Sequence, residues 1–316
     1  MENLPTASIF GALRKGRYST DMNILIIGCN GQLGTELGNQ LTRGTSDLAP
    51  IPADYRGTSV TGLDVPDVDV TNLPELTRQI KAFAPDILFN CAGYTNVDGC
   101  ETHADDAFRV NAIGTRNLAM AAESVGAKLI HLSTDYVFSG EGTSPYREFD
   151  LPNPQSVYGA TKLAGEAYAQ AFCSRWFVVR TSWLYGHHGK NFVKTMLRLA
   201  KEREEITVVD DQLGNPTNAA DLAYHLLKIA LTEEYGVYHC TGGGICSWYA
   251  FASRIVELSG LPARVKPCTT AEYASPTKRP AYSALDHAML RATVGDEMRP
   301  WQDALADFMQ QLQQEA

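Results

Sequence analysis

Short apolar stretches alternate with amphipathic stretches along the first two-thirds of the chain. The apolar stretches predict strands at 23–28, 59–64, 86–92, 128–133 and 176–185. The amphipathic stretches predict helices at about 32–43, 73–83, 101–125 and 157–172. Strands that alternate with helices are typical of a parallel sheet covered on both faces. The pattern therefore predicts an α/β fold with a Rossmann-type doubly wound parallel sheet.

The last third of the chain has a mixed pattern, with strands predicted at 205–211 and 236–242 and helices at 218–231, 247–260 and 301–314. We predict a dinucleotide-binding domain over 22–185, to which 218–242 returns. A smaller, mixed α/β substrate-binding lobe is then built from 186–217 and 243–316. Residues 1–21 lack the continuous apolar region of a secretory signal. We interpret them as a disordered tail or a start-site artefact.

Composition narrows the class of protein. The 316 residues carry a net charge of −9, and the short block "RKGR" at 14–17 is too small for a nucleic-acid surface. No stretch has the roughly 18 apolar residues of a membrane span. Seven cysteines without a C-x-x-C pair predict reduced thiols in a cytoplasmic protein and no structural zinc.

The stretch "GCNGQLG" places Gly28, Gly31 and Gly34 directly after the first predicted strand, where a helix begins. Glycines let the backbone approach a pyrophosphate, and the helix N-terminus offers unpaired N–H groups. In this strand–turn–helix context the glycines predict dinucleotide binding, although a tight turn is the simpler alternative.

Asp64 ends the second predicted strand, where a carboxylate can accept hydrogen bonds from the adenosine ribose. No arginine follows it immediately, which favours NADH over NADPH, but Arg56 lies nearby in the sequence. Asp69 and Val70 follow in position to reach the adenine.

The ends of the next two strands are rich in small and hydroxyl-bearing residues. "FNCAGYTNVDGCE" brings Ala92 and Gly93 to a strand end, where small side chains let a flat cofactor pack against the backbone. "LIHLSTDYVFSG" ends with Thr134 and Asp135 beside Ser133, a position where hydroxyls can bind a substrate carbonyl oxygen. Caps and turns are the more common use of such residues.

Tyr158 lies four residues before Lys162 in "VYGATKLAGE", so both side chains rise from one face of a helix. A free phenol has a pKa near ~10, and a neighbouring ammonium is expected to lower it. Tyr158 is then the proton donor to a carbonyl, while a nicotinamide cofactor delivers hydride. Tyr224 and Lys228 have the same spacing without this context, and we interpret them as structural.

Several motifs together resemble those of extended short-chain dehydrogenases/reductases: the glycine spacing, Asn90 to Gly93, Val110 to Thr115, and Tyr-x-x-x-Lys. More closely, "STDYVF", "RTSWLYG", "NFVKTMLRLAKER" and "VVDDQLGNPT" resemble the dTDP-4-dehydrorhamnose reductase family from Met22 to near the C-terminus. The resemblance implies that NADPH or NADH reduces the C4 keto group of dTDP-4-dehydro-L-rhamnose to give dTDP-L-rhamnose.

The resemblance also implies a role for each matching residue. Tyr158 is the proton donor, Lys162 holds the cofactor ribose, and Thr134 with Asp135 contacts the substrate. Trp183 packs against the sugar or the thymine. The remaining implied cofactor contacts are Gly31, Gln32 and Leu33 at the pyrophosphate, Asp64, Asp69 and Val70 at the adenosine, and Gly93, Tyr94 and Thr95 along the groove.

The chain departs from the family at Ala284, where "RPAYSALD" lacks a common arginine; the missing cation would weaken phosphate or interface contacts. Some members of the family carry Mg²⁺ at a dimer interface, so the resemblance leaves both Mg²⁺ and a homodimer open. Glu36 lies where one metal ligand could be, but we interpret it as an exposed helical residue.

Two other functions stay open. An epimerase or dehydratase uses the same tyrosine and lysine, but "STDY" offers only Asp135 where a dehydratase needs a carboxylate pair. A non-catalytic regulatory subunit, of the methionine adenosyltransferase type, keeps much of this fold, and fold does not determine function.

Overall fold

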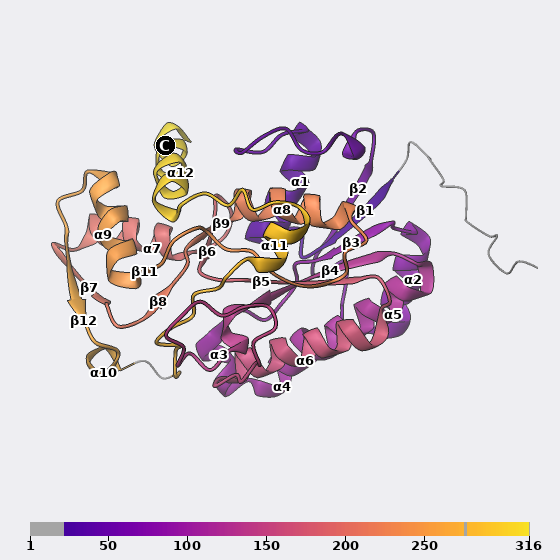
Figure 1. Ribbon diagram of the computed structural model, residues 1–316, viewed down its shortest axis with the longest axis horizontal. Coiled ribbons are helices and arrows are strands. Elements are labelled where there is room, and N and C mark those ends of the chain that lie inside the picture. Colours follow the sequence, from indigo (N-terminus) through magenta and orange to yellow (C-terminus); the bar gives the residue numbers. More distant parts are fainter. Residues whose placement is uncertain (1–21, 275–276, 316) are drawn as a thin grey trace, which may run out of the picture.

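The computed structural model describes residues 22–274 and 277–315, so the prediction for residues 1–21 lies outside it. Its centre is a parallel sheet built from six of the described strands (Figure 1). In spatial order they are β10 (Gly236–His239), β5 (Trp176–Thr181), β4 (Lys128–Thr134), β3 (Ile87–Asn90), β1 (Asn23–Ile27) and β2 (Ser59–Leu63). The prediction of a doubly wound α/β fold is confirmed.

Helices cover both faces of this sheet (Figure 1). One face carries α1 (Gln32–Arg43), α8 (Ala219–Leu231) and α11 (Ala288–Thr293), and the other carries α2 (Leu73–Phe83), α5 (Thr115–Val125) and α6 (Val157–Phe172). Alternation along β1 shows the cause, because Ile24 and Ile26 pack under α1 and α8 while Leu25 and Ile27 pack under α2 and α5. Buried apolar residues on both strand faces therefore require two helical layers.

The order of the strands creates a crevice at their carboxyl ends. The chain runs outward from β1 to β2 on one side and from β3 to β4 and β5 on the other. Open α/β sheets bind ligands at such a switch point. Gly28 follows β1 and Cys91 follows β3, so the glycine loop lies at this crevice.

The remaining elements form a second packed unit with its own apolar core. Its helices are α7 (Phe192–Glu202), α9 (Trp248–Ser259), α10 (Thr270–Tyr273) and α12 (Trp301–Glu315). Its paired strands are β7 (Glu205–Val209) with β12 (Arg264–Cys268), β6 (Leu184–Tyr185) with β9 (Thr217–Asn218), and β8 (Leu213–Gly214) with β11 (Cys246–Ser247). Since β10 pairs with β5, the chain returns to the large sheet before α9. The division into a dinucleotide-binding and a substrate-binding part stays a proposal.

Two elements differ from the prediction. The helix expected at 101–125 is divided into α3 (Val97–Thr102), α4 (Ala104–Phe108), a π-helical turn (Arg109–Gly114) and α5. The strand expected at 176–185 is broken by Trp183, which has a φ of 47°. Short helical turns at Ala53–Tyr55 and Asp135–Val137 complete the elements. In the part of the chain that is described, no helix has the length and apolar character needed to cross a membrane.

Candidate active site

The glycine loop lines a cavity of about 330 Å³ at the switch point. A Cβ atom at Gly28, whose φ is +80°, would lie 2.7 Å from the backbone nitrogen of Ala92. A Cβ at Gly34 would lie 2.2 Å from the carbonyl oxygen of Gly28. Both positions therefore require glycine, because the segment after β3 packs against Gly28 and the first turn of α1 packs on the loop at Gly34.

Asp64 and Asp69 line the same cavity, together with Val70. The carboxylate of Asp64 accepts hydrogen bonds from the backbone N–H groups of Asn30 (2.9 Å) and Val65 (2.8 Å). Hydrogen bonds from Thr71 lower the pKa of Asp69. The residues described around this cavity include these two carboxylates and no lysine or arginine.

A second cavity, of about 700 Å³, continues from the first and shares Gly31, Ala92 and Gly93 with it. It brings together most of the residues that the sequence singled out: Gln32, Leu33, Gly34, Thr95, Thr134, Asp135, Tyr158, Lys162 and Trp183. Tyr94 lines neither cavity. The segments after β3 and β5, the end of β4 and the start of α6 therefore meet in one cleft.

Tyr158 and Lys162 lie on α6, which begins after Ser156, whose hydroxyl accepts a hydrogen bond from the Gly159 N–H (3.1 Å). The phenol of Tyr158 is hydrogen-bonded to the Thr134 side chain. Lys162 Nζ donates to the carbonyl oxygen of Leu132, 2.5 Å away. The end of β4 thus holds both residues of the Tyr-x-x-x-Lys motif.

The expectation that Lys162 lowers the pKa of Tyr158 is wrong for this structure. Burial raises the pKa of the phenol, and the hydrogen bond to Thr134 opposes that effect only in part. Burial also lowers the pKa of Lys162 from 10.5 to about 8, although Glu166 opposes this change. Loss of hydration raises the pKa of the half-buried phenol by more than the hydrogen bond to Thr134 lowers it, and Lys162 itself is buried. Tyr158 consequently keeps its proton at neutral pH.

Asp135 is a buried carboxyl group beside the same hydroxyl. Its Oδ1 accepts a hydrogen bond from Thr134 Oγ1 (2.9 Å). Burial raises the pKa of Asp135 to about 6, and hydrogen bonds from Ser283 and Thr134 oppose the rise.

Trp183 lines the large cavity from the side of the smaller unit. Its ring stacks on Trp248, with centroids 3.6 Å apart and planes 7° from parallel. Its positive φ, rare for a bulky residue, turns the chain out of the sheet after β5. Sequence reasoning missed Trp248, because "SWYAF" showed only a helical pattern.

Asn111 lies within the helix predicted at 101–125, where no role was assigned to it. In the structure its side chain joins the segment after β3 to α6. Its Oδ1 accepts from the Tyr94 N–H (2.8 Å), and its Nδ2 donates to the Tyr94 carbonyl (3.1 Å) and to Thr161 Oγ1 (3.1 Å). The π-helical turn aims this side chain between β3 and α6. Such turns are frequent at functional sites.

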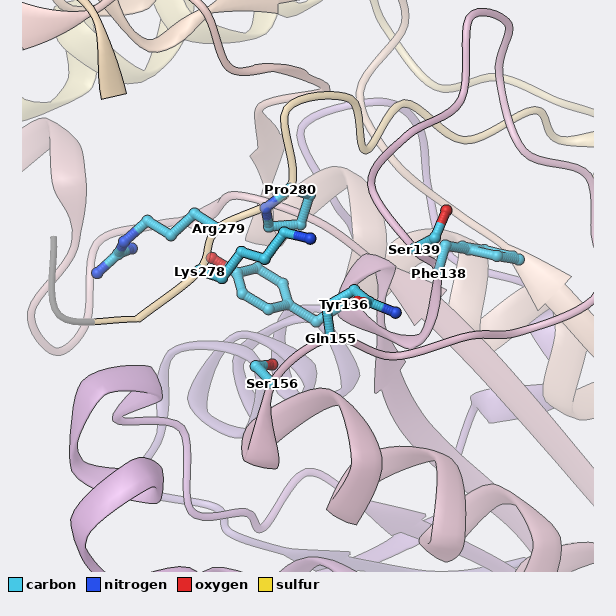
Figure 2. A pocket seen from close by; sticks show the side chains of 8 residues that line it. All are labelled: Tyr136, Phe138, Ser139, Gln155, Ser156, Lys278, Arg279 and Pro280. Carbon is cyan, nitrogen blue, oxygen red and sulfur yellow. The ribbon is translucent and has the colours of Figure 1, made fainter. Parts of the chain in front are cut away.

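A small side cavity continues the cleft past Tyr136 (Figure 2). The ring of Tyr136 lies edge-on to that of Tyr158, with centroids 5.5 Å apart. Lys278 and Arg279 line it and point in opposite directions from one loop, with Ser156 on the facing helix (Figure 2). These cations, more than a hundred residues beyond α6, gave no local signal in the sequence.

The comparison with known families is decisive. The family model described as "RmlD substrate binding domain" matches residues 22–314. The chain belongs to this family. The family resemblance found in the sequence is confirmed.

Solved structures and curated relatives agree with this assignment. The dTDP-4-dehydrorhamnose reductase of Clostridium acetobutylicum is 46% identical, with a TM-score of 0.87 over 92% of this chain and 100% of that chain. The reductase of Bacillus anthracis, solved in complex with NADP, is 41% identical, with a TM-score of 0.86 over 92% and 99%. The spore coat polysaccharide biosynthesis protein SpsK of Bacillus subtilis is 40% identical over 91% of this chain and 97% of its own.

Ala284 lies inside the protein. Its side chain is fully buried, and its carbonyl accepts a hydrogen bond from the Tyr146 N–H (2.8 Å). The residue lines none of the cavities of the cleft. The effect of the missing arginine on phosphate or interface contacts stays a prediction.

Glu36 accepts a hydrogen bond from Gln40 (3.1 Å). Among the described residues, no group of three or more His, Cys, Asp or Glu side chains could hold a metal ion. The described residues of a single chain therefore form no site that fits Mg²⁺.

Proposed function

We propose that this protein reduces the C4 keto group of dTDP-4-dehydro-L-rhamnose to dTDP-L-rhamnose, with NADPH or NADH as the hydride donor. The observation that carries the proposal is the Thr134–Tyr158–Lys162 arrangement in a cavity continuous with the glycine loop. The names of the relatives, and the NADP bound to one of them, support the substrate and the cofactor.

The residues of the chain divide the chemistry among them. A bound reduced nicotinamide supplies hydride to the carbonyl carbon. Tyr158 donates its phenolic proton to the carbonyl oxygen, which becomes negative as the hydride arrives. Thr134 orients that phenol, and the Lys162 ammonium stabilises the phenolate that remains. A Cβ at Gly93 would lie 3.9 Å from Lys162 Nζ, so glycine leaves room for a cofactor ribose beside the ammonium.

The rest of the cleft suits a sugar nucleotide. The stacked rings of Trp183 and Trp248 offer a flat apolar surface to a sugar or thymine. The diphosphate must lie close to the sugar, and Lys278 and Arg279 are cations beside Tyr136 in the adjoining side cavity. Arg279 also forms an ion pair with Asp98 (3.1 Å) on α3. We assign the diphosphate to this side of the cleft.

The adenosine cavity favours NADH. A 2′-phosphate needs a cation, whereas ribose hydroxyls need acceptors. Asp64 and Asp69 supply acceptors, and the described lining contains no cation. The NADP bound to the Bacillus anthracis relative supports use of both cofactors. We therefore propose that both dinucleotides serve, with NADH preferred.

The test is loss of reduced-nicotinamide absorbance with the dTDP-4-keto sugar generated in place, with NADH and NADPH in parallel. Tyr158→Phe removes the proton donor and should lower the rate by about 10²–10⁴-fold while nucleotide binding stays. Tyr224→Phe, in the second Tyr-x-x-x-Lys copy, is the matched control and should keep full activity. A fully active Tyr158→Phe protein would overturn the mechanism. Tight nucleotide binding without turnover would favour a regulatory subunit. A cytoplasmic location and a homodimer stay predictions.

A further inference from the structure

A buried ion pair lies one helical turn beyond Lys162. Glu166 on α6 and Arg180 on β5 have side chains 2% and 4% exposed. Arg180 Nε donates to Glu166 Oε1 (2.9 Å), and Nη2 donates to Oε2 (2.7 Å), which is a bidentate pairing. Ser133, the residue before Thr134, donates to Glu166 Oε1 (2.5 Å).

The arginine is held from its other side as well. His239 Nδ1 lies 3.1 Å and 3.0 Å from two backbone carbonyl oxygens, those of Tyr146 and Asp286. Nδ1 must therefore carry the hydrogen, which leaves Nε2 as the acceptor for Arg180 Nη1 at 3.3 Å. Burial lowers the pKa of His239 to about 3, with Arg180 adding to the effect, so the ring is neutral. The guanidinium is therefore held by Glu166 from α6 and by His239 from β10.

The register of α6 on β4 explains why this pair matters to the cleft. Tyr158, Lys162 and Glu166 are spaced by four residues and share one face of α6. In the same order they bind Thr134, the Leu132 carbonyl and Ser133, three consecutive residues at the end of β4. Glu166 is the residue of this set that connects α6 to both β4 and β5, through its hydrogen bonds with Ser133 and Arg180.

Glu166 also affects the charge state of Lys162. The described titratable groups that act on Lys162 or are acted on by it are Glu166, Cys91 and His131. Burial raises the pKa of Cys91 to about 12 and lowers the pKa of His131, so both are neutral at pH 7. Glu166 is therefore the negative charge among these groups, and Arg180 compensates it in part.

We propose that Glu166, held by Arg180 and Ser133, is the positioning residue of the cleft: it keeps Lys162 in its ammonium form and α6 in register with Thr134. The inference rests on the proposed function, because it assigns Glu166 to the reaction of Tyr158 and Lys162. Glu166 lines none of the cavities of the cleft, so it acts through Lys162 and not on the substrate.

The proposal predicts a shift in the pH profile. Lys162 must be protonated to hold a ribose and to stabilise the phenolate, so function falls as the pH rises past the pKa of Lys162, about 8. Removing the charge of Glu166 makes the ammonium easier to deprotonate. Glu166→Gln should move the alkaline limb of kcat/KM to lower pH by about one unit, as expected for the loss of one nearby opposite charge.

Two measurements on each protein separate this role from a structural one. The first is kcat/KM against pH with the dTDP-4-keto sugar. The second is the affinity for NADH and for NADPH against pH, followed by cofactor fluorescence without any sugar. If no sugar is turned over, the proposed function fails. The pH at which the affinity for the nucleotide falls still decides the role of Glu166.

The chain offers a matched control in Asp221 and Arg299. Asp221 is 1% exposed and also binds its arginine through two hydrogen bonds, of 2.9 Å and 2.7 Å. Asp221→Asn removes a buried carboxylate of the same kind away from the cleft, so it should lower stability without moving the limb. The proposal would be overturned if the alkaline limb of Glu166→Gln lay at the same pH as that of the wild type. It would also be overturned if Glu166→Gln and Asp221→Asn shifted that limb equally.

Glu166→Asp separates charge from position and keeps the test decisive if Glu166→Gln does not fold. The shorter side chain keeps the negative charge but cannot reach Ser133 and Arg180 together. We expect an unmoved alkaline limb and a kcat that is roughly 10- to 100-fold lower, because small errors in position are costly. An unchanged kcat in Glu166→Asp would contradict the positioning role.

Discussion

Replacing Lys162 by methionine should abolish activity and yet stabilise the protein without cofactor. Burial lowers the pKa of Lys162 from 10.5 to about 8. Because each pKa unit corresponds to about 1.4 kcal/mol, the buried ammonium costs the fold about 3 kcal/mol at pH 7. Methionine has a similar volume and no charge. The substitution also removes the hydrogen bond to the Leu132 carbonyl, which costs about 1 kcal/mol of stability. The net gain expected for Lys162→Met is about 2 kcal/mol.

The sign of the pH dependence follows from proton counting. Between about pH 8 and 10.5 the unfolded lysine binds a proton that the folded one has lost, so wild-type stability rises with pH in this window. The cost of the ammonium is fully present below pH 8 and absent above 10.5. The extra stability of Lys162→Met over the wild type should therefore decrease between about pH 8 and 10.5. At the upper end the variant should be less stable than the wild type by about 1 kcal/mol.

Urea unfolding without cofactor, followed by circular dichroism at pH 7 and at several values up to pH 10.5, measures this difference. Lys228→Met is the control, because Lys228 is partly exposed and pairs with Glu297 (2.7 Å). It should lose no more than about 1 kcal/mol and keep its activity. If Lys162→Met were no more stable than wild type at pH 7, or its advantage did not change with pH, the reasoning from burial would be refuted.

Two further predictions concern the two ends of the cleft. Gly34→Ala should abolish dinucleotide binding, measured by fluorescence titration, because its Cβ would lie 2.2 Å from the Gly28 carbonyl oxygen; Gly38→Ala, one turn later with open space around it, should bind normally. Arg279→Gln should raise the KM for the dTDP-sugar roughly tenfold with kcat little changed, since it removes a charge that binds substrate and transition state alike. Asp98→Asn, which releases Arg279 from its ion pair, should not raise that KM.

The sequence predicted features that depend on short-range order. Alternation and helical periodicity located the strands of the large sheet and the helices that cover it, because those patterns report which faces are buried. The spacing of Gly28, Gly31 and Gly34 predicted a tight loop between β1 and α1, where the close backbone approach tolerates no side chain at Gly28 or Gly34. The four-residue spacing of Tyr158 and Lys162 placed them on one helical face.

Other features depend on contacts between segments far apart in the chain. The break at Trp183 and its stacking on Trp248 join two packed units across 65 positions of sequence. Asn111 became a clamp only because a π-helical turn aims it at Tyr94 and Thr161. No local pattern encodes these arrangements.

Burial of side chains is the clearest feature that depends on the folded chain. From the sequence, Lys162 was expected to lower the pKa of Tyr158, which treats both groups as if water surrounded them. In the folded chain Lys162 is buried and Tyr158 is half-buried, so loss of hydration dominates and raises the pKa of the phenol. Sequence patterns were sufficient to indicate the family and the sheet, and they predicted Tyr158 and Lys162 as the reacting pair. The protonation state of that pair, and the Glu166–Arg180 ion pair behind it, follow from how α6 packs on β4 and β5.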